Sequence, residues 1–421
     1  MFYEDPYAHI FEAIVTDVQN VKVIENGAEI EKTELALDKT CFYPESGGQI
    51  SDTGTIEGEA VEYVHEFKNV AGDYIIHHRL KKAFDLKPGA TVKCSIDSEL
   101  RIRNMQNHTG QHILSESFIR THDLHTISMH MGLDYMSIDL AVSDKFGASL
   151  PKNFKLDKKI IEDAENMANS IIRKALDVKT FYVNKAELSN YKLRKTPELE
   201  DDSVRIVEIG GFDVSLCCGT HVKNTGEIGI IKVISQEKAG GAVRIKFLCA
   251  CQCFEDYRKK NYILSESSEM LSIAFSDLPK TIEKINQENK AIAKSRAELF
   301  DKYFAEFASG LCAGKHIENG IYLSECPDFD FNEISKMAQI FSKAQGSFGF
   351  ILIKTDQAAG TFRFILGKTA SYPRDVKQIF SEISVEFSIK GGGSQLVVQG
   401  GSVETRMLAD FTKKVKERLS L

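Results

Sequence analysis

The chain has 421 residues, 43% hydrophobic and 27% charged, a composition typical of a soluble globular protein with about two to four domains. Its net charge of −7 argues against indiscriminate coating of nucleic acid, which depends on phosphate neutralisation, but allows a local basic face. The N-terminus has no secretory signal, no segment approaches the ~18 apolar residues of a membrane span, and the nine cysteines are an odd number. We therefore expect reduced thiols in the cytoplasm.

Residues 1–96 have the pattern of a small β-barrel or sandwich. Short alternating apolar runs, such as those at 13–18 and 74–76, are separated by Asn-Gly, Gly-Gly and Pro-Gly turn signals. Residues 42–49 read Phe-Tyr-Pro-Glu-Ser-Gly-Gly-Gln, a loop in which Gly47 and Gly48 permit unusual backbone angles and close approach to a ligand. A plain surface turn is the alternative at this point.

Residues 97–252 predict an α+β domain built on a mostly antiparallel sheet faced by helices. Asp97 is the expected N-cap of a helix over about 98–120, and a second amphipathic helix is expected over about 157–176. A hairpin is predicted over 127–140. Further strands are predicted at 180–183, 204–209, 228–234 and 243–249.

The remainder predicts a helical hairpin linker over 253–310, broken once near Pro279, and then a small α/β domain over 311–421. The second arm of the hairpin has an imperfect coiled-coil-like seam, so it is predicted to be a spacer or a dimerising element. The fold class is therefore α+β multidomain. In the last domain, strands are expected at 349–354 and 361–366, and helices at 333–344, 375–385 and 404–419.

His108 and His112 lie four residues apart on the first predicted helix. This spacing places both imidazoles on one face, where they can bind one ion. A peptidase of this pattern needs a glutamate directly after the first histidine. Thr109 occupies that position, so peptidase chemistry is not expected.

A second pair with the same offset, Cys217 and His221, lies in a tight Cys-Gly-Thr-His segment between strands. Gly219 lets the backbone fold so that the two side chains converge. Cys218 is adjacent and competes with Cys217 for the ligand role. The two pairs together supply the four nitrogen and sulfur ligands that tetrahedral zinc takes. The three cysteines within 249–253 are read as strand residues with buried or idle thiols.

These motifs resemble the editing domain shared by alanyl- and threonyl-tRNA synthetases. More closely, the chain resembles the free-standing alanyl-tRNA editing proteins, the AlaX family, of the long type with a C-terminal extension. The matching segments occur in the family's order and the resemblance covers essentially the whole chain; they are residues 42–49, 107–114, 211–213 and 217–222. The link to synthetases also implies nucleotide and ATP binding, although the chain is expected to deacylate tRNA without charging it.

The resemblance implies a trans-editing hydrolase that cleaves the ester of mischarged tRNA(Ala), chiefly carrying serine and in some members glycine. A pocket built for alanine cannot strongly exclude glycine or an isostere with an added hydroxyl, so a second hydrolytic site is needed. The zinc ion would either activate water or anchor the substrate's amino group. By position in the motifs, the implied zinc ligands are His108, His112, Cys217 and His221.

Other site residues are implied by the same motifs. Gln111 would face the aminoacyl group, and His130 would position substrate or water. The implied substrate contacts are Gly47, Gly48, Gln49, Thr109 and Asp213. A local excess of five positive over two negative residues after His221 predicts tRNA contacts at Lys223, Arg244 and Lys246.

Three alternatives remain open at the level of sequence. The zinc could be purely structural in a tRNA-binding protein without hydrolytic activity. The Gly47-Gly48-Gln49 tripeptide also resembles the loop of peptide release factors. The C-terminal domain could capture tRNA, as the family link favours, or pair two chains as a homodimer; Gln395 and Leu396 depart from the family's pattern after the glycine run at 391–393.

Overall fold

The computed structural model describes residues 1–25, 27–68, 74–141, 155–195 and 202–420, and the chain divides into two compact units, Met1–Glu266 and Ser267–Leu421. The first unit contains both predicted domains, 1–96 and 97–252, and the predicted linker 253–310 is divided between the two units. The expected fold class is confirmed, with a closed N-terminal barrel, antiparallel sheets and a C-terminal α/β region. No helix in the described ranges combines the length and the apolar character needed to cross a membrane.

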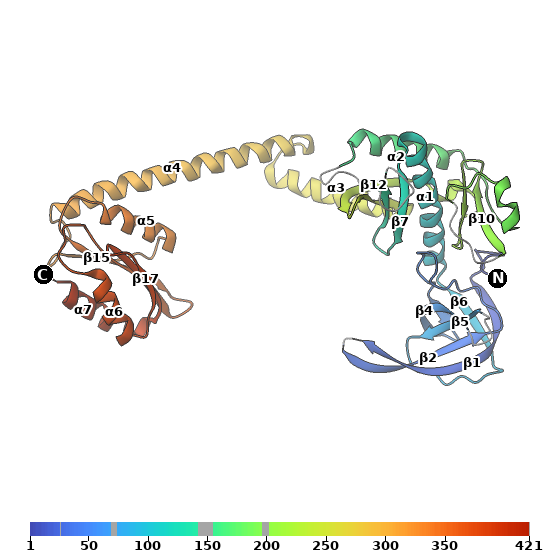
Figure 1. Ribbon diagram of the computed structural model, residues 1–421, viewed down its shortest axis with the longest axis horizontal. Coiled ribbons are helices and arrows are strands. Elements are labelled where there is room, and N and C mark those ends of the chain that lie inside the picture. Colours follow the sequence, from blue (N-terminus) through green and yellow to red (C-terminus); the bar gives the residue numbers. More distant parts are fainter. Residues whose placement is uncertain (26, 69–73, 142–154, 196–201, 421) are drawn as a thin grey trace. The chain divides into compact units, whose positions relative to one another are not determined.

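The N-terminal barrel closes in the order β1-β2-β5-β4-β3-β6 (Figure 1). Alternation along the first strand turns Phe11, Ala13 and Val15 into the barrel core, because successive side chains of a strand point to opposite faces. The connection between the second and third strands, residues 38–53, carries the Phe-Tyr-Pro-Glu-Ser-Gly-Gly-Gln loop. The strands are β1 Ile10–Glu25, β2 Ala28–Leu37, β3 Gly54–Ile56, β4 Glu59–Lys68, β5 Tyr74–Leu80 and β6 Thr91–Ile96.

Helix α1, Ser98–His122, follows the barrel directly. The Asp97 carboxylate accepts hydrogen bonds from the backbone N–H groups of Glu99 and Leu100, so the predicted cap is confirmed. Every residue from 107 to 115 is buried, which a helix can achieve only when elements cover all of its sides. A Cβ on Gly110 would lie 2.5 Å from the sulfur of Cys249, so this glycine permits the close approach of helix and sheet.

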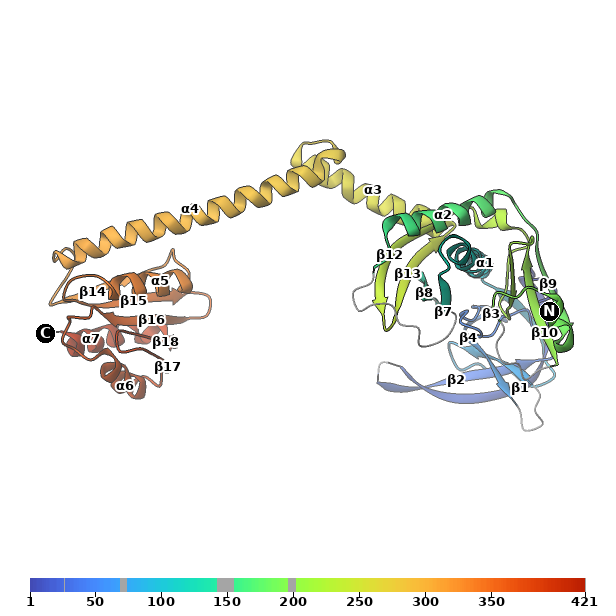
Figure 2. The same ribbon diagram turned by 45° about the horizontal axis from the view of Figure 1, so that its top comes forward.

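Two separate antiparallel sheets flank α1, where the sequence predicted one (Figure 2). Their orders are β12-β13-β8-β7 and β11-β10-β9, and helix α2, Lys158–Arg173, packs beside α1. The expected strand at 228–234 begins only at Ile231, because Thr225–Ile228 is a short 3-10 helix. The strands are β7 His125–Met131, β8 Met136–Ala141, β9 Val178–Asn184, β10 Ser203–Ile209, β11 Asp213–Leu216, β12 Ile231–Ala239 and β13 Ala242–Cys249.

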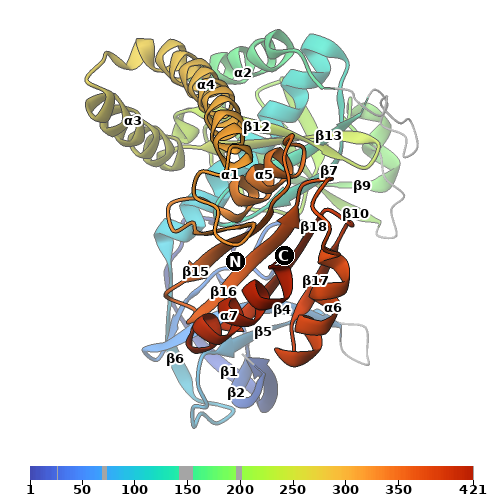
Figure 3. The ribbon, with the colours of Figure 1, turned by 90° about the vertical axis from the view of Figure 1, so that its left-hand side faces the viewer.

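The second compact unit contains a five-stranded sheet of order β14-β15-β16-β18-β17, in which only the pair β14 and β15 is parallel. Helix α5 and the end of α4 cover one face, and helices α6 and α7 cover the other (Figure 3). The glycine run 390–393 is itself strand β17, and the last helix begins later than predicted because 397–404 is a strand. The remaining elements are α3 Cys251–Leu271, α4 Leu278–Cys312, β14 Ile321–Glu325, α5 Phe331–Ser342, β15 Gly349–Asp356, β16 Thr361–Lys368, α6 Val376–Glu386, β17 Lys390–Gly393, β18 Val397–Glu404 and α7 Leu408–Leu419.

The cysteine run at 249–253 was predicted as a strand, and this was wrong. Cys249 ends β13, Ala250 has a left-handed backbone with φ of 52°, and Cys251 begins α3. The predicted break in the helical hairpin is confirmed: α3 ends at Leu271, and Pro279 lies in the first turn of α4, where a missing N–H costs nothing.

A buried ion pair fastens α1 to the barrel loop. The Arg101 guanidinium binds the carboxylate of Asp52, with Nε 3.0 Å from Oδ1, and also donates to the carbonyl oxygens of Cys41 and Pro6. Asp52 accepts a further hydrogen bond from the backbone N–H of Tyr43 at 2.6 Å. The two charged side chains are only 2% and 0% exposed, so each neutralises a charge that water cannot reach.

Replacing Arg101 should therefore destabilise the first unit. Arg101→Met leaves Asp52 buried without its cation, and breaking such a pair costs about 3–5 kcal/mol. We expect a lower urea midpoint in unfolding followed by circular dichroism. The control is Arg103→Met on the same helix, because Arg103 is half-buried and forms no ion pair with another described residue. Equal losses in the two variants would contradict the assignment.

Candidate metal centre

A cleft of about 660 Å³ opens in the first unit beside the C-terminal half of α1. One wall carries His108 and His112 from the helix and Cys217 from the segment after β11. Residues of β7, β9, β10 and β11 and of the barrel loop at Ser46 and Gly47 also line the cleft. The cleft therefore lies where the barrel, the helix and both sheets meet.

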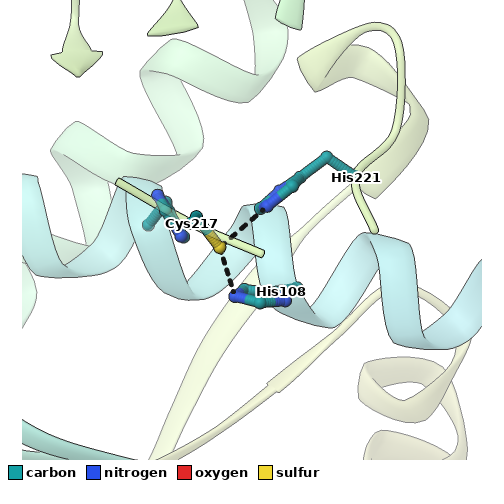
Figure 4. A group of neighbouring side chains, drawn as sticks. His108, Cys217 and His221 are labelled. Atoms are coloured by element: carbon teal, nitrogen blue, oxygen red, sulfur yellow. Dashed lines mark hydrogen bonds between the residues drawn. The ribbon is translucent and has the colours of Figure 1, made fainter. Parts of the chain in front are cut away.

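His108, His112, Cys217 and His221 converge at this wall, and their ligand atoms all lie within 4.8 Å of one another. The sulfur of Cys217 is 3.2 Å from Nε2 of His108 and 3.3 Å from Nε2 of His221 (Figure 4). The three imidazoles are at most 3% exposed, whereas Cys217 is half-buried and lines the cleft. The two sequence pairs, about a hundred residues apart, thus form one cluster.

The other ring nitrogen of each histidine is hydrogen-bonded to a buried oxygen. Nδ1 of His108 lies 2.9 Å from Oε1 of Gln49, and Nδ1 of His112 lies 3.0 Å from the carboxylate of Asp213. These acceptors require the proton on Nδ1, which leaves Nε2 with its lone pair toward the cluster.

The third histidine is oriented in the same way by a residue of α1. The Thr109 hydroxyl donates to the carbonyl of Met105 at 2.9 Å, so it must accept from Nδ1 of His221 at 3.1 Å. All three histidines therefore present Nε2, the arrangement in which outer hydrogen bonds orient metal-binding imidazoles.

Electrostatics favour the ligand form of the cysteine. Burial alone would raise the pKa of the Cys217 thiol, but His108, His221 and His112 outweigh it and hold that pKa well below its usual value. Burial is also the main reason that the pKa of His221 falls to about 3, which keeps this imidazole neutral. The pKa of His112 is raised despite its burial, because Cys217 and Asp213 favour its protonated form. A thiolate among imidazoles is the donor set that metal binding needs.

The segment 217–221 can adopt its path only because residue 219 is glycine. A Cβ at this position would lie 2.0 Å from Cε1 and 2.1 Å from Nδ1 of His108. The Arg205 guanidinium holds the segment from the other side, donating to the carbonyls of Cys217 at 2.7 Å and Gly219 at 2.8 Å. Cys217 therefore faces the histidines, while the exposed Cys218 turns away and its carbonyl accepts from the Tyr3 hydroxyl.

The predicted substrate contacts divide into two groups. Gly47 lines the cleft, and Gly48 lies next to it, with room for a Cβ limited by Met129 at 3.2 Å. Gln49, Thr109 and Asp213 are almost completely buried behind the imidazoles and do not line the cleft. Their hydrogen bonds orient the histidines, a role that the sequence did not indicate.

Gln111 lies in the cleft next to the cluster. Its Nε2 donates to the Ser115 hydroxyl at 2.8 Å, and the Thr126 hydroxyl donates to the same oxygen at 2.8 Å. Its Oε1 is buried and has no hydrogen-bond partner among the described residues. Gln111 thus offers a polar group to a ligand that enters the cleft.

His130 is not brought into the cleft. A β-bulge between Thr126 and Ser128 shifts the register of β7, so that Thr126 pairs with Leu140 while His130 pairs with Ser137. Residues paired across strands share a face, and the bulge therefore moves His130 to the opposite, exposed face of the sheet. Thr126 and Ser128, one on each face of this strand, both line the cleft, whereas His130 does not.

The three predicted tRNA-binding cations are each engaged within the first unit. Lys223 lies 3.6 Å from Asp5 and over the ring of Tyr7, away from the other two. Arg244 pairs with Asp139 at 2.7 and 2.9 Å, and Lys246 lies 2.9 Å from Glu237. Arg244 and Lys246 share the outer face of β13.

The cleft contains residues that the sequence did not point out. Arg194 donates to the carbonyl of His112 at 2.9 Å, Lys195 is exposed at the rim, and Tyr182 is 58% exposed. The basic run over 192–195 was the sequence signal that could have pointed to these residues. Cations combined with an exposed aromatic side chain are typical of nucleic-acid binding. None of the described residues that line the cleft is an aspartate or glutamate.

Two stretches match known families. Residues 204–246 match the threonyl and alanyl tRNA synthetase second additional domain, and residues 2–100 match the class II (A) tRNA synthetases. The barrel thus lies in one matched segment, and Cys217 and His221 of the cluster lie in the other, whereas His108 and His112 lie between the two. The class defined by fold and site is that of the synthetase-related editing proteins.

Proteins similar in sequence to this chain identify the family within this class. The alanyl-tRNA editing protein AlaX-L of Pyrococcus horikoshii is 30% identical over 406 residues, which are 95% of this chain and 93% of that protein. The alanine–tRNA ligase of Methanopyrus kandleri is 28% identical over 415 residues, 95% of this chain but 42% of the ligase. The C-Ala domain of Aquifex aeolicus alanyl-tRNA synthetase aligns with 24% of this chain and 91% of that domain, at 16% identity and a TM-score of 0.22.

This chain belongs to the AlaX-L family of alanyl-tRNA editing proteins. The enzyme class expected from the sequence, an aminoacyl-tRNA deacylase, is confirmed by this membership. The expectation of ATP and nucleotide binding is not supported by these comparisons.

The Asp213 carboxylate should matter for metal affinity although it is not a ligand. Asp213→Asn removes the charge that orients His112, and loss of such an outer contact costs about 10–100-fold in affinity. We expect this loss in zinc titrations against a competing chelator. Glu208→Gln, on the adjacent strand β10, is the control because Glu208 makes no ion pair with any described residue. Unchanged affinity in Asp213→Asn would show that the hydrogen bond to His112 does not support the site.

Proposed function

We propose that this chain deacylates mischarged tRNA(Ala), chiefly Ser-tRNA(Ala) and also Gly-tRNA(Ala), at a zinc ion held by His108, His112, Cys217 and His221. The observation that carries the proposal is the position of this cluster on the wall of a cleft that also contains Gln111. The relative from Pyrococcus horikoshii, named an alanyl-tRNA editing protein, supports the choice of tRNA(Ala). The reaction would take place in the cytoplasm.

The donor set fits zinc. Bonds of about 2.3 Å to sulfur and 2.1 Å to nitrogen in a tetrahedron place these atoms about 3.6 Å apart. The observed separations of Cys217 Sγ from two imidazole nitrogens, 3.2 and 3.3 Å, are close to that value. Zinc bound there would supply a Lewis acid or an anchor for the substrate's amino group.

Gln111 is the residue best placed to recognise the aminoacyl group. Its Oε1 is a buried acceptor without a partner among the residues that the structure describes, so a serine hydroxyl or an α-amino group can donate to it. A site that hydrogen-bonds a substrate group discriminates against analogues that lack this group. The hydroxyls of Ser115 and Thr126 hold the carboxamide in position.

The rim of the cleft suits the 3′ end of a tRNA. Unpaired bases stack on exposed aromatic rings, and Tyr182 offers such a ring on β9. Lys195 lines the same cleft, is exposed and forms no ion pair with the described residues, so its charge is available for a phosphate. Together, Tyr182 and Lys195 would guide the acceptor end of the tRNA toward Gln111.

The absence of a carboxylate among the described cleft residues favours catalysis by positioning. Among the described residues, no aspartate or glutamate lines the cleft, so no carboxylate of this kind is in place to take a proton from water. Holding the ester carbonyl and a water molecule in reactive geometry can itself supply much of the rate enhancement. The hydroxyl groups around Gln111 are the protein groups that can orient such a water molecule.

A deacylation panel tests the proposal. We expect hydrolysis of Ser-tRNA(Ala) and Gly-tRNA(Ala), little hydrolysis of Ala-tRNA(Ala) and Ser-tRNA(Thr), and loss of activity with chelator and recovery with zinc. His108→Ala and Cys217→Ala should lose both zinc and activity. His9→Ala is the matched control, because His9 is exposed and outside the cluster.

A purely structural zinc is the competing possibility, since four buried or half-buried protein ligands are also the coordination of structural sites. It predicts that chelation or Cys217→Ala alters folding, seen by circular dichroism, while any hydrolysis per folded molecule is unchanged. No hydrolysis of Ser-tRNA(Ala) by the zinc-loaded protein would reject the editing function for this substrate.

The second compact unit is proposed to capture tRNA. Arg363 and Lys390 line a groove of about 660 Å³ together with Gly391, Gly400 and Gly401. Cations that line a groove suit a phosphate chain. The alternative is a homodimer through α4, which exposes apolar side chains; these include Ile285, Ile292, Leu299 and Tyr303.

A chain ending after Leu271, the last residue of α3, separates these roles. We expect it to hydrolyse Ser-tRNA(Ala) at saturating substrate and to bind tRNA more weakly, with an effect seen in KM rather than kcat. Full-length Arg363→Gln with Lys390→Gln should reproduce the weaker binding. Unchanged tRNA affinity together with a smaller sedimenting species would assign the unit to dimerisation instead.

A further inference from the structure

A second cluster of metal-binding side chains lies on the barrel, away from the cleft. Glu34 on β2, His65 on β4 and His77 on β5 have ligand atoms within 4.8 Å of one another. The sheet order β2-β5-β4 makes these three strands neighbours. No role was predicted for any of these residues from the sequence.

Strand register explains why the three side chains meet. His77 is paired directly with His65 on one side and with Ala36 on the other, and Glu34 lies two residues from Ala36 on the same face. The neighbouring residues Leu35 and Val64 point into the barrel core. The cluster therefore lies on the outer face, yet Glu34 and His77 are only 4% and 7% exposed.

One nitrogen of this cluster lacks a partner. Nδ1 of His65 is buried and has no hydrogen bond to any described residue. Buried polar atoms are nearly always paired, so an orphaned imidazole nitrogen calls for a ligand. Burial, more than the nearby charges of His77 and Arg79, lowers the pKa of His65 and keeps its ring neutral. A neutral ring is the form that binds metal.

In the same cluster, a carboxylate oxygen of Glu34 and a ring nitrogen of His77 approach each other. Oε2 of Glu34 lies 3.9 Å from Nδ1 of His77, and the Gln19 carboxamide approaches both, at 3.3 and 3.2 Å. Arg79 holds the other carboxylate oxygen of Glu34 through Nε at 2.7 Å. A carboxylate that an arginine holds through one oxygen is an oriented ligand.

We propose that Glu34, His65 and His77 bind a divalent transition-metal ion, foremost zinc, at a site independent of the cleft. Two histidines and a glutamate form a known three-ligand zinc set that leaves a fourth position open. Rotation of the Gln19 carboxamide would direct its oxygen to that position; water is the other candidate. Because tetrahedral ligands lie about 3.4 Å apart, the side chains need to close by about 1 Å. The ion would cross-link β2, β5 and β4.

Metal stoichiometry tests this site on the full chain. After equilibrium dialysis against micromolar zinc, we expect two equivalents in the wild type, one in His65→Gln and one in Cys217→Ala. The matched control His9→Gln should keep two, because His9 is an exposed histidine of the same unit outside both clusters. Circular dichroism verifies that each variant is folded, and His77→Gln provides a second variant with the same expected loss.

Cobalt substitution identifies which ion is lost. A thiolate-to-cobalt charge-transfer band reports the cluster with Cys217, so this band should persist in His65→Gln and disappear in Cys217→Ala. If His65→Gln and His77→Gln bind as much metal as the wild type, the barrel site does not exist and the cluster is a hydrogen-bonded network around Arg79. A failure of the editing proposal would appear instead in the deacylation panel, which does not involve these residues.

Discussion

Three buried oxygens hold the three imidazoles of the metal cluster in one tautomer, and the rest of the site depends on this constraint. They come from different parts of the fold: Gln49 from the barrel loop, Thr109 from α1 and Asp213 from β11. In a water-excluded interior such hydrogen bonds are strong, and their loss is costly. The barrel, helix α1 and the sheet β11-β10-β9 must therefore all pack correctly before the Nε2 atoms converge. This accounts for the complete burial of residues 107–115 of the helix.

Much of this arrangement was predictable from local patterns. The four-residue spacing of each ligand pair, the Asp97 cap and the barrel strands all follow from short-range periodicity and turn chemistry. The pairing of Cys217 with His108, 109 residues apart in the chain, came from zinc's demand for four ligands and from the family resemblance. The motifs thus indicated the candidate ligand residues, and the coordination chemistry of zinc indicated that the two pairs form one site.

The features that were not predicted depend on the direction in which a side chain points, and the order of residues along the chain does not contain this information. Gln49 and Asp213 were expected at the substrate, and their orientation toward the imidazoles is set by packing over separations of 59 and 101 residues. Strand β11 has four residues, too few to display a period. The position of His130 is decided by a single bulge, because one extra residue exchanges the two faces of a strand.

Gly219 carries a consequence for how this sequence can vary. Its backbone is not in the left-handed region, so its own conformation would tolerate alanine, and the obstacle is the His108 ring 2.0 Å from the missing Cβ. The restriction at 219 is therefore conditional on the residue at 108. Loss of the imidazole would remove the two shortest contacts and leave Oε1 of Gln49 at 2.9 Å, whereas a Cβ at 219 meets the ring for as long as residue 108 is histidine. The effects of substitutions at the two positions should therefore be coupled and non-additive.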